Sequence, residues 1–248
     1  MSTTLTFLGI AGYDIAGPRR RILIDPCLTD NPTAPCGPED LAAPDVILVS
    51  HAAFDHLGDT AAIARRTGAP VVCGADVRAL LLDQGLPSNQ VRATVWGIVV
   101  EVGGVVVRPV ECHHWSQARL ADGSYVSGVP LGFIVETEPG VRIYHYGDTA
   151  IFGDLRLIGE LYAPTVGLLG CSQPRALAEA TPGPGHLLTG KCRRARRPWP
   201  PRCWACDWPW PATTWRQATP MWRNSCAWSP TMTQRARASP WPCSPVRP

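Results

Sequence analysis

One stretch, residues 45–60, limits what this chain can fold into more than any other. It reads D-V-I-L-V-S-H-A-A-F-D-H-L-G-D-T. Four consecutive apolar residues, three of them β-branched, predict a buried strand that stops at Ser50. Gly58 then allows the backbone to turn, and the two residues after it can cap a helix that begins near Ala61.

The end of this predicted strand delivers side chains that bind metals. His51, Asp55 and His56 lie within six positions of one another, so they can converge on one point beyond the strand. Imidazole nitrogen and carboxylate oxygen suit zinc or a similar divalent metal. The alternative is an ordinary loop whose polar residues face water.

The segment resembles the metal-binding signature S-H-x-H-x-D-H of the metallo-β-lactamase superfamily. More narrowly, it is similar to the branch of metal-dependent hydrolases that includes ascorbate-6-phosphate lactonase. One position departs from the pattern, because its second His is Ala53 here. The resemblance covers roughly residues 1–190 and implies an α+β fold, the four-layer αβ/βα sandwich, with an incomplete carboxyl-terminal part.

Two later segments extend the resemblance. The sequence E-C-H-H-W-S at 111–116 follows a predicted strand, and its H-W-S resembles a later metal-binding loop, which favours His114 over His113. The sequence Y-H-Y-G-D-T-A-I-F-G-D at 144–154 is close to the family's form, in which the first Asp bridges two metals; that residue is Asp148 here. The alternatives are a surface His pair and a turn-forming Gly-Asp.

Three further polar residues are weaker candidates. Asp25 ends an I-D-P strand typical of the family, so it either orients a ligand His or starts a turn before proline. His145 precedes Asp148 by an odd number of residues, so it is predicted to face the other side of its strand and not to be a ligand. His186 lies in a Gly-rich segment that resembles an active-site loop, or is a simple loop His.

Periodicity and turn residues predict the remaining elements. Strands are expected at 5–9, 21–26 (after a turn at Gly17-Pro18), 70–73, 91–95, 98–102, 105–110, 132–135, 141–146 and 166–169, and helices at 61–67, 75–84 and 152–161. This order suggests sheets packed together with helices outside.

Composition predicts a cytoplasmic protein without a membrane partner, whereas the small-molecule substrate is what the family resemblance implies. No stretch is apolar for long enough to cross a bilayer, and the amino terminus leads into a strand without a signal peptide. The five cysteines before residue 191 are widely spaced. They do not suggest a disulfide framework, which favours a reducing compartment.

The chain divides in composition near residue 190. Residues 1–190 carry 12 Lys and Arg against 19 Asp and Glu, whereas residues 191–248 carry 11 against one, with eight of the ten Trp. We therefore expect a metallo-hydrolase domain at 1–190 and a disordered tail at 191–248.

The tail has three interpretations. Basic and aromatic residues together could bind nucleic acid, the least favoured interpretation. Cys203 and Cys206 could form a metal knuckle, but no second pair has the right spacing. The favoured hypothesis is a frameshift near Gly190: the shifted frame of 203–211 encodes an apolar strand after a Gly, and the slip would remove the superfamily's final ligand His.

The resemblance also implies a mechanism. His51 and His114 would serve one metal position, Asp55 and His56 the other, and Asp148 would bridge them. A metal-bound water with its pKa lowered to about 7 would be the nucleophile, oriented by Asp55, on an ester, lactone or phosphodiester bond.

The expected activity is impaired. Ala53 weakens the first position, so one tightly held metal is favoured over two. Zinc is the first choice, with manganese or iron as alternatives. The competing hypothesis is a degenerate scaffold that folds without catalysing.

Overall fold

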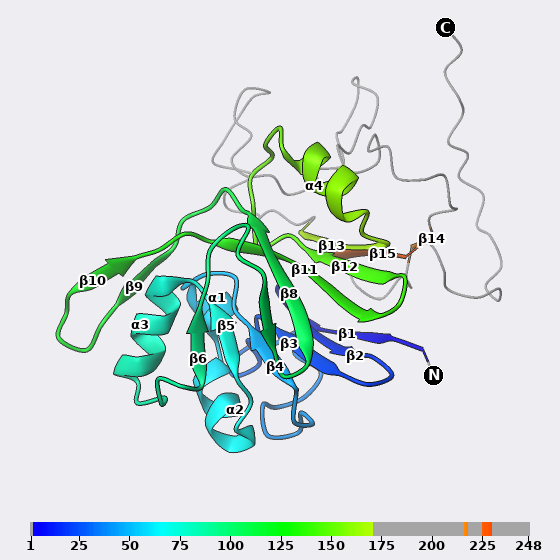
Figure 1. Cartoon of the computed structure of the whole chain (residues 1–248). Helices are drawn as coiled ribbons and strands as arrows, with labels where there is room; N and C mark the ends of the chain where they lie inside the picture. The colour runs from blue at the N-terminus through cyan, green and yellow to red at the C-terminus, as the bar shows by residue number, and fades with distance from the viewer. Residues whose placement is uncertain (1, 171–215, 218–224, 230–248) are drawn as a thin grey trace, which may run out of the picture.

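Two β-sheets lie face to face with helices outside them (Figure 1). The computed structural model describes residues 2–170, 216–217 and 225–229. The first sheet has the order β1 (Thr4–Gly9), β2 (Gly12–Ala16), β3 (Arg21–Ile24), β4 (Val46–Leu48), β5 (Val71–Cys73), β6 (Val91–Ala93). Its strands β3 to β6 are parallel to one another, and β1 and β2 are antiparallel.

The second sheet is mostly antiparallel. Its order is β14 (Arg216–Gln217), β15 (Ser225–Ser229), β13 (Val166–Gly170), β12 (Val141–His145), β11 (Leu131–Glu138), β8 (Val105–Glu111), β7 (Val100–Val102), and only β12 and β13 pair in parallel. A separate hairpin consists of β9 (Gln117–Arg119) and β10 (Tyr125–Ser127).

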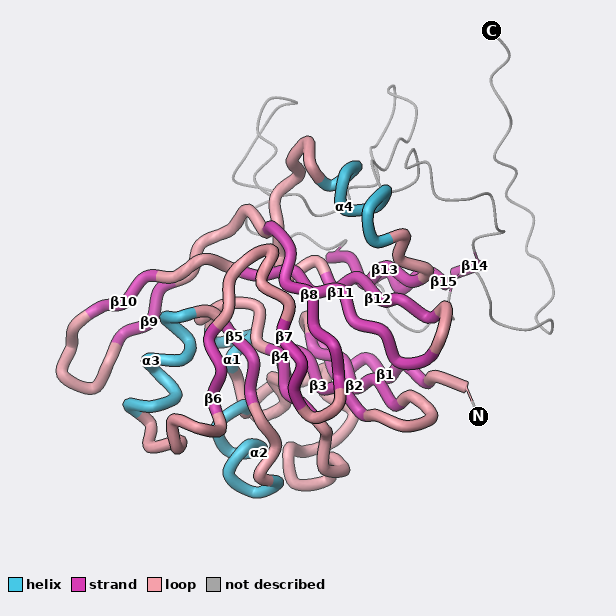
Figure 2. Tube along the Cα trace, in the orientation of Figure 1, coloured by secondary structure: helices cyan, strands magenta, loops and turns pink. Residues whose placement is uncertain are grey.

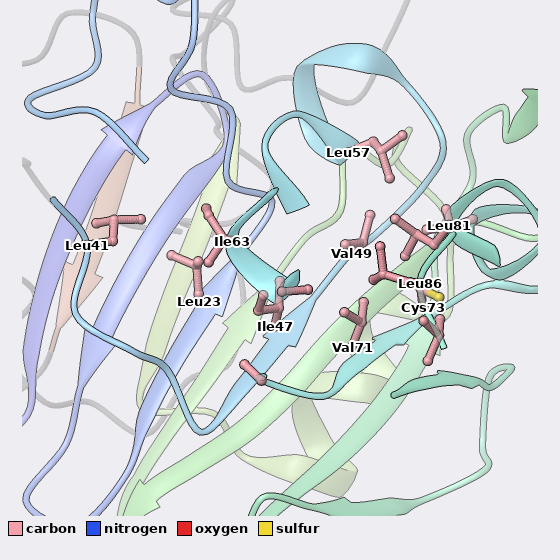
Figure 3. Close-up of a cluster of buried hydrophobic side chains, with 14 of the residues drawn as sticks. Leu23, Leu41, Ile47, Val49, Leu57, Ile63, Val71, Cys73, Leu81 and Leu86 are labelled. Atoms are coloured by element: carbon pink, nitrogen blue, oxygen red, sulfur yellow. The ribbon is translucent and has the colours of Figure 1, made fainter. Parts of the chain in front are cut away.

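Three apolar cores separate four layers. On the outer face of the first sheet pack α2 (Thr60–Thr67) and α3 (Ala75–Asp83), whose Ile63 and Leu81 meet Ile47 and Val71 of the sheet (Figure 3). The second core lies between the sheets and contains Phe133. The third lies between the second sheet and α4 (Leu155–Tyr162), on the far side of the molecule (Figure 2). This arrangement confirms the predicted αβ/βα sandwich.

The apolar run at residues 46–49, just before His51, illustrates how the sequence encodes these layers. Val46 and Leu48 point into the core between the sheets, whereas Ile47 and Val49 point toward the helices. All four are fully buried. A strand covered on both faces needs a continuous apolar run rather than an alternating one, which confirms the prediction of a buried strand.

Several helices and strands were not predicted. A turn alone was expected between the first two predicted strands, but β2 lies there, with Tyr13 and Ile15 in the core between the sheets. One turn of helix, α1 (Phe54–Leu57), fills the loop after β4. The hairpin of β9 and β10 follows the E-C-H-H-W-S segment. No helix among the described residues is both long and apolar enough to cross a bilayer.

Most of the predicted tail lies outside the described residues, as do His186 and the pair Cys203 and Cys206. Within it the structure describes β14 and β15, and β15 pairs antiparallel with β13. The division at residue 190 stays a prediction.

Candidate metal centre

Two buried imidazoles meet at the end of β4. His51 follows the strand, and α1 carries His56; each is 1% exposed. Their ring centroids are 4.1 Å apart. The turn after α1 packs tightly: Gly58 has φ +38°, and a Cβ there would lie 2.3 Å from the Pro26 carbonyl oxygen. The loop therefore holds both imidazoles against the end of β3.

Asp25 fixes the orientation of His56. Its carboxylate is fully buried, and Oδ2 accepts a hydrogen bond from His56 Nδ1 at 2.7 Å. Ser50 donates its backbone N–H to Oδ1 at 2.8 Å and its hydroxyl to Oδ2 at 2.6 Å. The parallel pairing of β3 with β4 brings these residues together. Of the two interpretations of Asp25, this geometry matches the one in which it orients a histidine.

The hydrogen bonds also determine which nitrogens can bind a metal. Since the Ser50 hydroxyl donates to Asp25, its oxygen is the acceptor for His51 Nδ1 at 3.0 Å. His56 Nδ1 likewise gives its proton to Asp25. In both rings the Nε2 atom is then the one with a lone pair. Among the described residues, His51 Nε2 is buried without a hydrogen-bond partner, and a buried lone pair of this kind is costly unless something binds it.

Burial and charge set the protonation of these groups. Burial, together with the neighbouring His56, lowers the pKa of His51 to about 3, so its imidazole is neutral. Burial also disfavours charge on His56 and Asp25, but their mutual attraction and hydrogen bond outweigh it. The pKa of Asp25 is therefore lowered and that of His56 is raised.

The loop after β12 brings a carboxylate to the two imidazoles. Asp148 has φ +66° and follows Gly147 at φ +65°, where a Cβ would lie only 2.1 Å from a backbone carbonyl oxygen. Tyr146 donates its hydroxyl to Asp148 Oδ1 at 2.8 Å. One ligand atom from each of His51, His56 and Asp148 lies within 4.8 Å of the others. Two nitrogens and one oxygen at this spacing fit a divalent metal.

His114 lies next to this group, and His113 does not. The His114 ring stands edge-on to His51, with centroids 4.9 Å apart, and its Nε2 is 3.7 Å from Asp148 Oδ2. His113 instead bonds Glu111 Oε1 through Nε2 at 2.6 Å and stacks on Phe152. The role of His114 as a ligand stays a prediction.

The other predicted residues lie at the margin of the site. Asp55, on α1, is partly exposed and is not in the three-residue group. His145 is buried and donates Nε2 to the Ala11 carbonyl oxygen at 3.0 Å; that it is not a ligand stays a prediction. Sequence reasoning missed the roles of Ser50 and Tyr146; Ser50 was visible only as the first letter of the metal-binding signature.

Known proteins resemble this chain over the same region. The beta-lactamase superfamily domain matches residues 20–197. A UPF0173 metal-dependent hydrolase of Rubrobacter xylanophilus is 43% identical over 169 residues, 67% of this chain and 69% of that protein. One from Methanosarcina mazei is 38% identical over 165 residues, 66% of this chain and 69% of that protein.

A solved structure supports the same assignment. Igni18, a metallo hydrolase from the archaeon Ignicoccus hospitalis, is 30% identical and superposes with a TM-score of 0.56, covering 68% of this chain and 70% of that one. The predicted superfamily and fold are confirmed, and the narrower likeness to ascorbate-6-phosphate lactonase stays a prediction. This chain belongs to the beta-lactamase superfamily, with the UPF0173 metal-dependent hydrolases as its relatives.

Proposed function

We propose that this chain binds one divalent metal ion, zinc first and manganese or iron as alternatives, and uses it to hydrolyse an ester, lactone or phosphodiester bond. The observation that carries the proposal is the convergence of His51, His56 and Asp148, whose ligand atoms lie within 4.8 Å of one another. The partnerless, buried Nε2 of His51 supports it further.

A metal held by these residues would keep a position for water beside its protein ligands, as catalytic metal sites do. A metal held there would lower the pKa of a bound water to about 7 and polarise the substrate. Asp25 and Ser50 hold the two imidazoles with their Nε2 atoms toward it. Tyr146 holds one oxygen of Asp148, which leaves the other for the metal.

The proposal simplifies the two-metal arrangement implied by the family resemblance. In that arrangement His51 pairs with His114, and Asp55 with His56. The structure groups His51 with His56 instead, and places His114 beside Asp148. We propose that His114 is a further ligand and that Asp55, at the edge of the site, orients the attacking water.

Metal content tests the proposal directly. Elemental analysis of the purified chain should give about one metal per chain. His114→Ala should lower the metal content, whereas His113→Ala, which changes the neighbouring residue on the same loop, should leave it unchanged. Equal metal content in His51→Ala and the unchanged chain would overturn the proposal.

A second candidate function is a scaffold that folds without catalysing. Ala53 favours it, because a His stands at this place in the superfamily signature. Metal analysis separates the two: near-zero zinc, manganese and iron would favour the scaffold. Restoring the pattern with Ala53→His should raise metal content and hydrolysis if the chain is an impaired enzyme, and neither if it is a scaffold.

The scissile bond is a further part of the proposal. Ester, lactone and phosphodiester substrates all suit a water activated at one metal. We propose a small-molecule substrate and a cytoplasmic location. Parallel assays with a lactone, an aryl ester and a bis-aryl phosphodiester, each with and without chelator, would select the bond.

We also propose that residues 191–248 are translated from a shifted frame. The superfamily match ends at residue 197, close to the change in composition. Deep sequencing of the gene tests this: an intact frame through Pro248 would overturn it, and a one-base slip near Gly190 would support it. Loss of salt-sensitive RNA binding on truncation at Gly190 would instead favour the nucleic-acid interpretation.

A further inference from the structure

A second buried carboxylate, Asp76, is linked to the site through Ser116. It belongs to the first turn of α3 and is fully buried. Its Oδ2 accepts the hydroxyl proton of Ser116. A carboxylate at a helix amino terminus is favoured by the helix dipole, which helps α3 to hold this charge away from water.

Ser116 connects Asp76 to the two metal loops, the segments that carry His51 and His114. Because its hydroxyl proton goes to Asp76, its oxygen is oriented as an acceptor, and it takes the Ala52 N–H at 3.1 Å. Ala52 follows His51 directly, and Ser116 is two residues after His114. The hydrogen bond therefore ties together the two segments whose imidazole rings meet 4.9 Å apart.

The base of the β9–β10 hairpin closes around the same carboxylate. Gly128, directly after β10, donates its N–H to the Ser116 carbonyl oxygen at 3.2 Å. A Cβ at Gly128 would lie 2.2 Å from Asp76 Oδ1, and one at Gly74 would lie 2.9 Å from it. A Cβ at either position would collide with the carboxylate, so the two glycines leave it the space that it occupies beside Ser116.

We infer that Asp76 and Ser116 form a positioning pair, which sets the separation of His51 and His114 at the proposed metal centre. Asp25 orients His56 through its Nδ1 atom, and the pair holds the backbone beside His51 through the Ala52 N–H. Neither member of the pair belongs to the group that could hold the ion. The inference rests on the proposed function, since it assigns the pair a role in metal binding.

A purely structural role is the competing explanation, because α3 also packs against the hairpin. Asp83, which is exposed where Asp76 is buried, provides a control on the same helix. Its carboxylate accepts the Ala121 N–H of the same hairpin at 2.7 Å, but it touches neither metal loop. Both substitutions remove a contact between α3 and the hairpin, and only one of them reaches the metal loops.

The experiment is a Co²⁺ titration of the full chain, followed by its visible absorption, in parallel with hydrogen exchange at the Ala52 amide. His51→Ala identifies the absorption that belongs to the centre. Substituting partners that orient ligands costs about 10–100-fold in metal affinity, so we expect Asp76→Ala to weaken Co²⁺ binding about 10-fold and to speed exchange at Ala52.

Two further variants sharpen the result. Asp76→Asn keeps an oxygen acceptor for the Ser116 hydroxyl and should restore most of the lost affinity. Asp83→Ala should match the unchanged chain in both measurements. Equal Co²⁺ affinity in the two alanine variants would overturn the inference, even if exchange at Ala52 rose. No Co²⁺ binding by the unchanged chain would instead overturn the proposed metal centre, and the inference with it.

Discussion

Replacing Asp25 with Asn tests how the site is held together. The two side chains have nearly the same shape, and Asn tolerates the left-handed backbone at this position, where φ is +45°. Asp25 accepts three hydrogen bonds, two from Ser50 and one from His56. The Asn amide has only one acceptor oxygen. Whichever way the amide is turned, its NH₂ group therefore faces at least one of the buried donors of Ser50 and His56.

The expected cost follows from that mismatch. A buried donor left without an acceptor costs about 1–3 kcal/mol, and hydrogen bonds to a charged acceptor are about twice as strong as neutral ones. Asp25→Asn should therefore lower the free energy of unfolding by about 2–4 kcal/mol. It should also weaken metal binding about 10–100-fold, since His56 loses its orienting partner.

Urea unfolding followed by circular dichroism, with chelator present, measures the first effect without the contribution of bound metal. Asp30→Asn is the control, because Asp30 also has a positive φ, +58°, but its side chain is exposed; its stability should change by less than about 0.5 kcal/mol. The reasoning would be refuted if Asp25→Asn changed stability no more than Asp30→Asn.

Three further outcomes follow from the structure. Gly147→Ala should destabilise the chain severely because a Cβ would lie 2.1 Å from a carbonyl oxygen. Gly140 also has a positive φ, but a Cβ there would meet no described atom within 4 Å, so Gly140→Ala should cost only the backbone strain of about 1 kcal/mol. Equal midpoints of thermal unfolding for the two variants would contradict this. Phe133→Ala, fully buried between the sheets, should cost about 3–5 kcal/mol in urea, and the half-exposed Leu157→Ala should cost much less. Asp55→Asn should lower kcat and leave metal content unchanged; a parallel loss of metal would show that Asp55 is a ligand instead.

The layers could be predicted from the sequence because apolar patterning dictates them. The run Val46 to Val49 is apolar throughout since both faces of β4 are covered. The missed strand β2 lacks this pattern. Its Asp14 is a buried charge, and only the fold shows that Arg21, on the neighbouring strand, donates Nε to it at 2.9 Å. A charge that is paired across strands looks like a turn residue when the sequence is read alone.

Local spacing predicted part of the site and long-range contacts determined the rest. His51 and His56 were visible because they follow one strand, and Asp148 because its segment resembles the family's form. The partner of Ser50 is 25 positions away and that of Ser116 is 40. Such contacts depend on how strands and helices are placed, and no local pattern encodes them.

The outer edge of β13 has a consequence for the carboxyl-terminal region. One edge of this strand is hydrogen-bonded to β12, and the other pairs with β15, at residues 225–229. Ladder hydrogen bonds join main-chain groups, so almost any extended segment can occupy that second edge, whatever its side chains. A chain cut after Gly170 would leave this edge open beside the buried Val166 and Leu168. An open edge can pair with the same edge of another molecule, so we expect the shortened chain to aggregate more readily than the full chain.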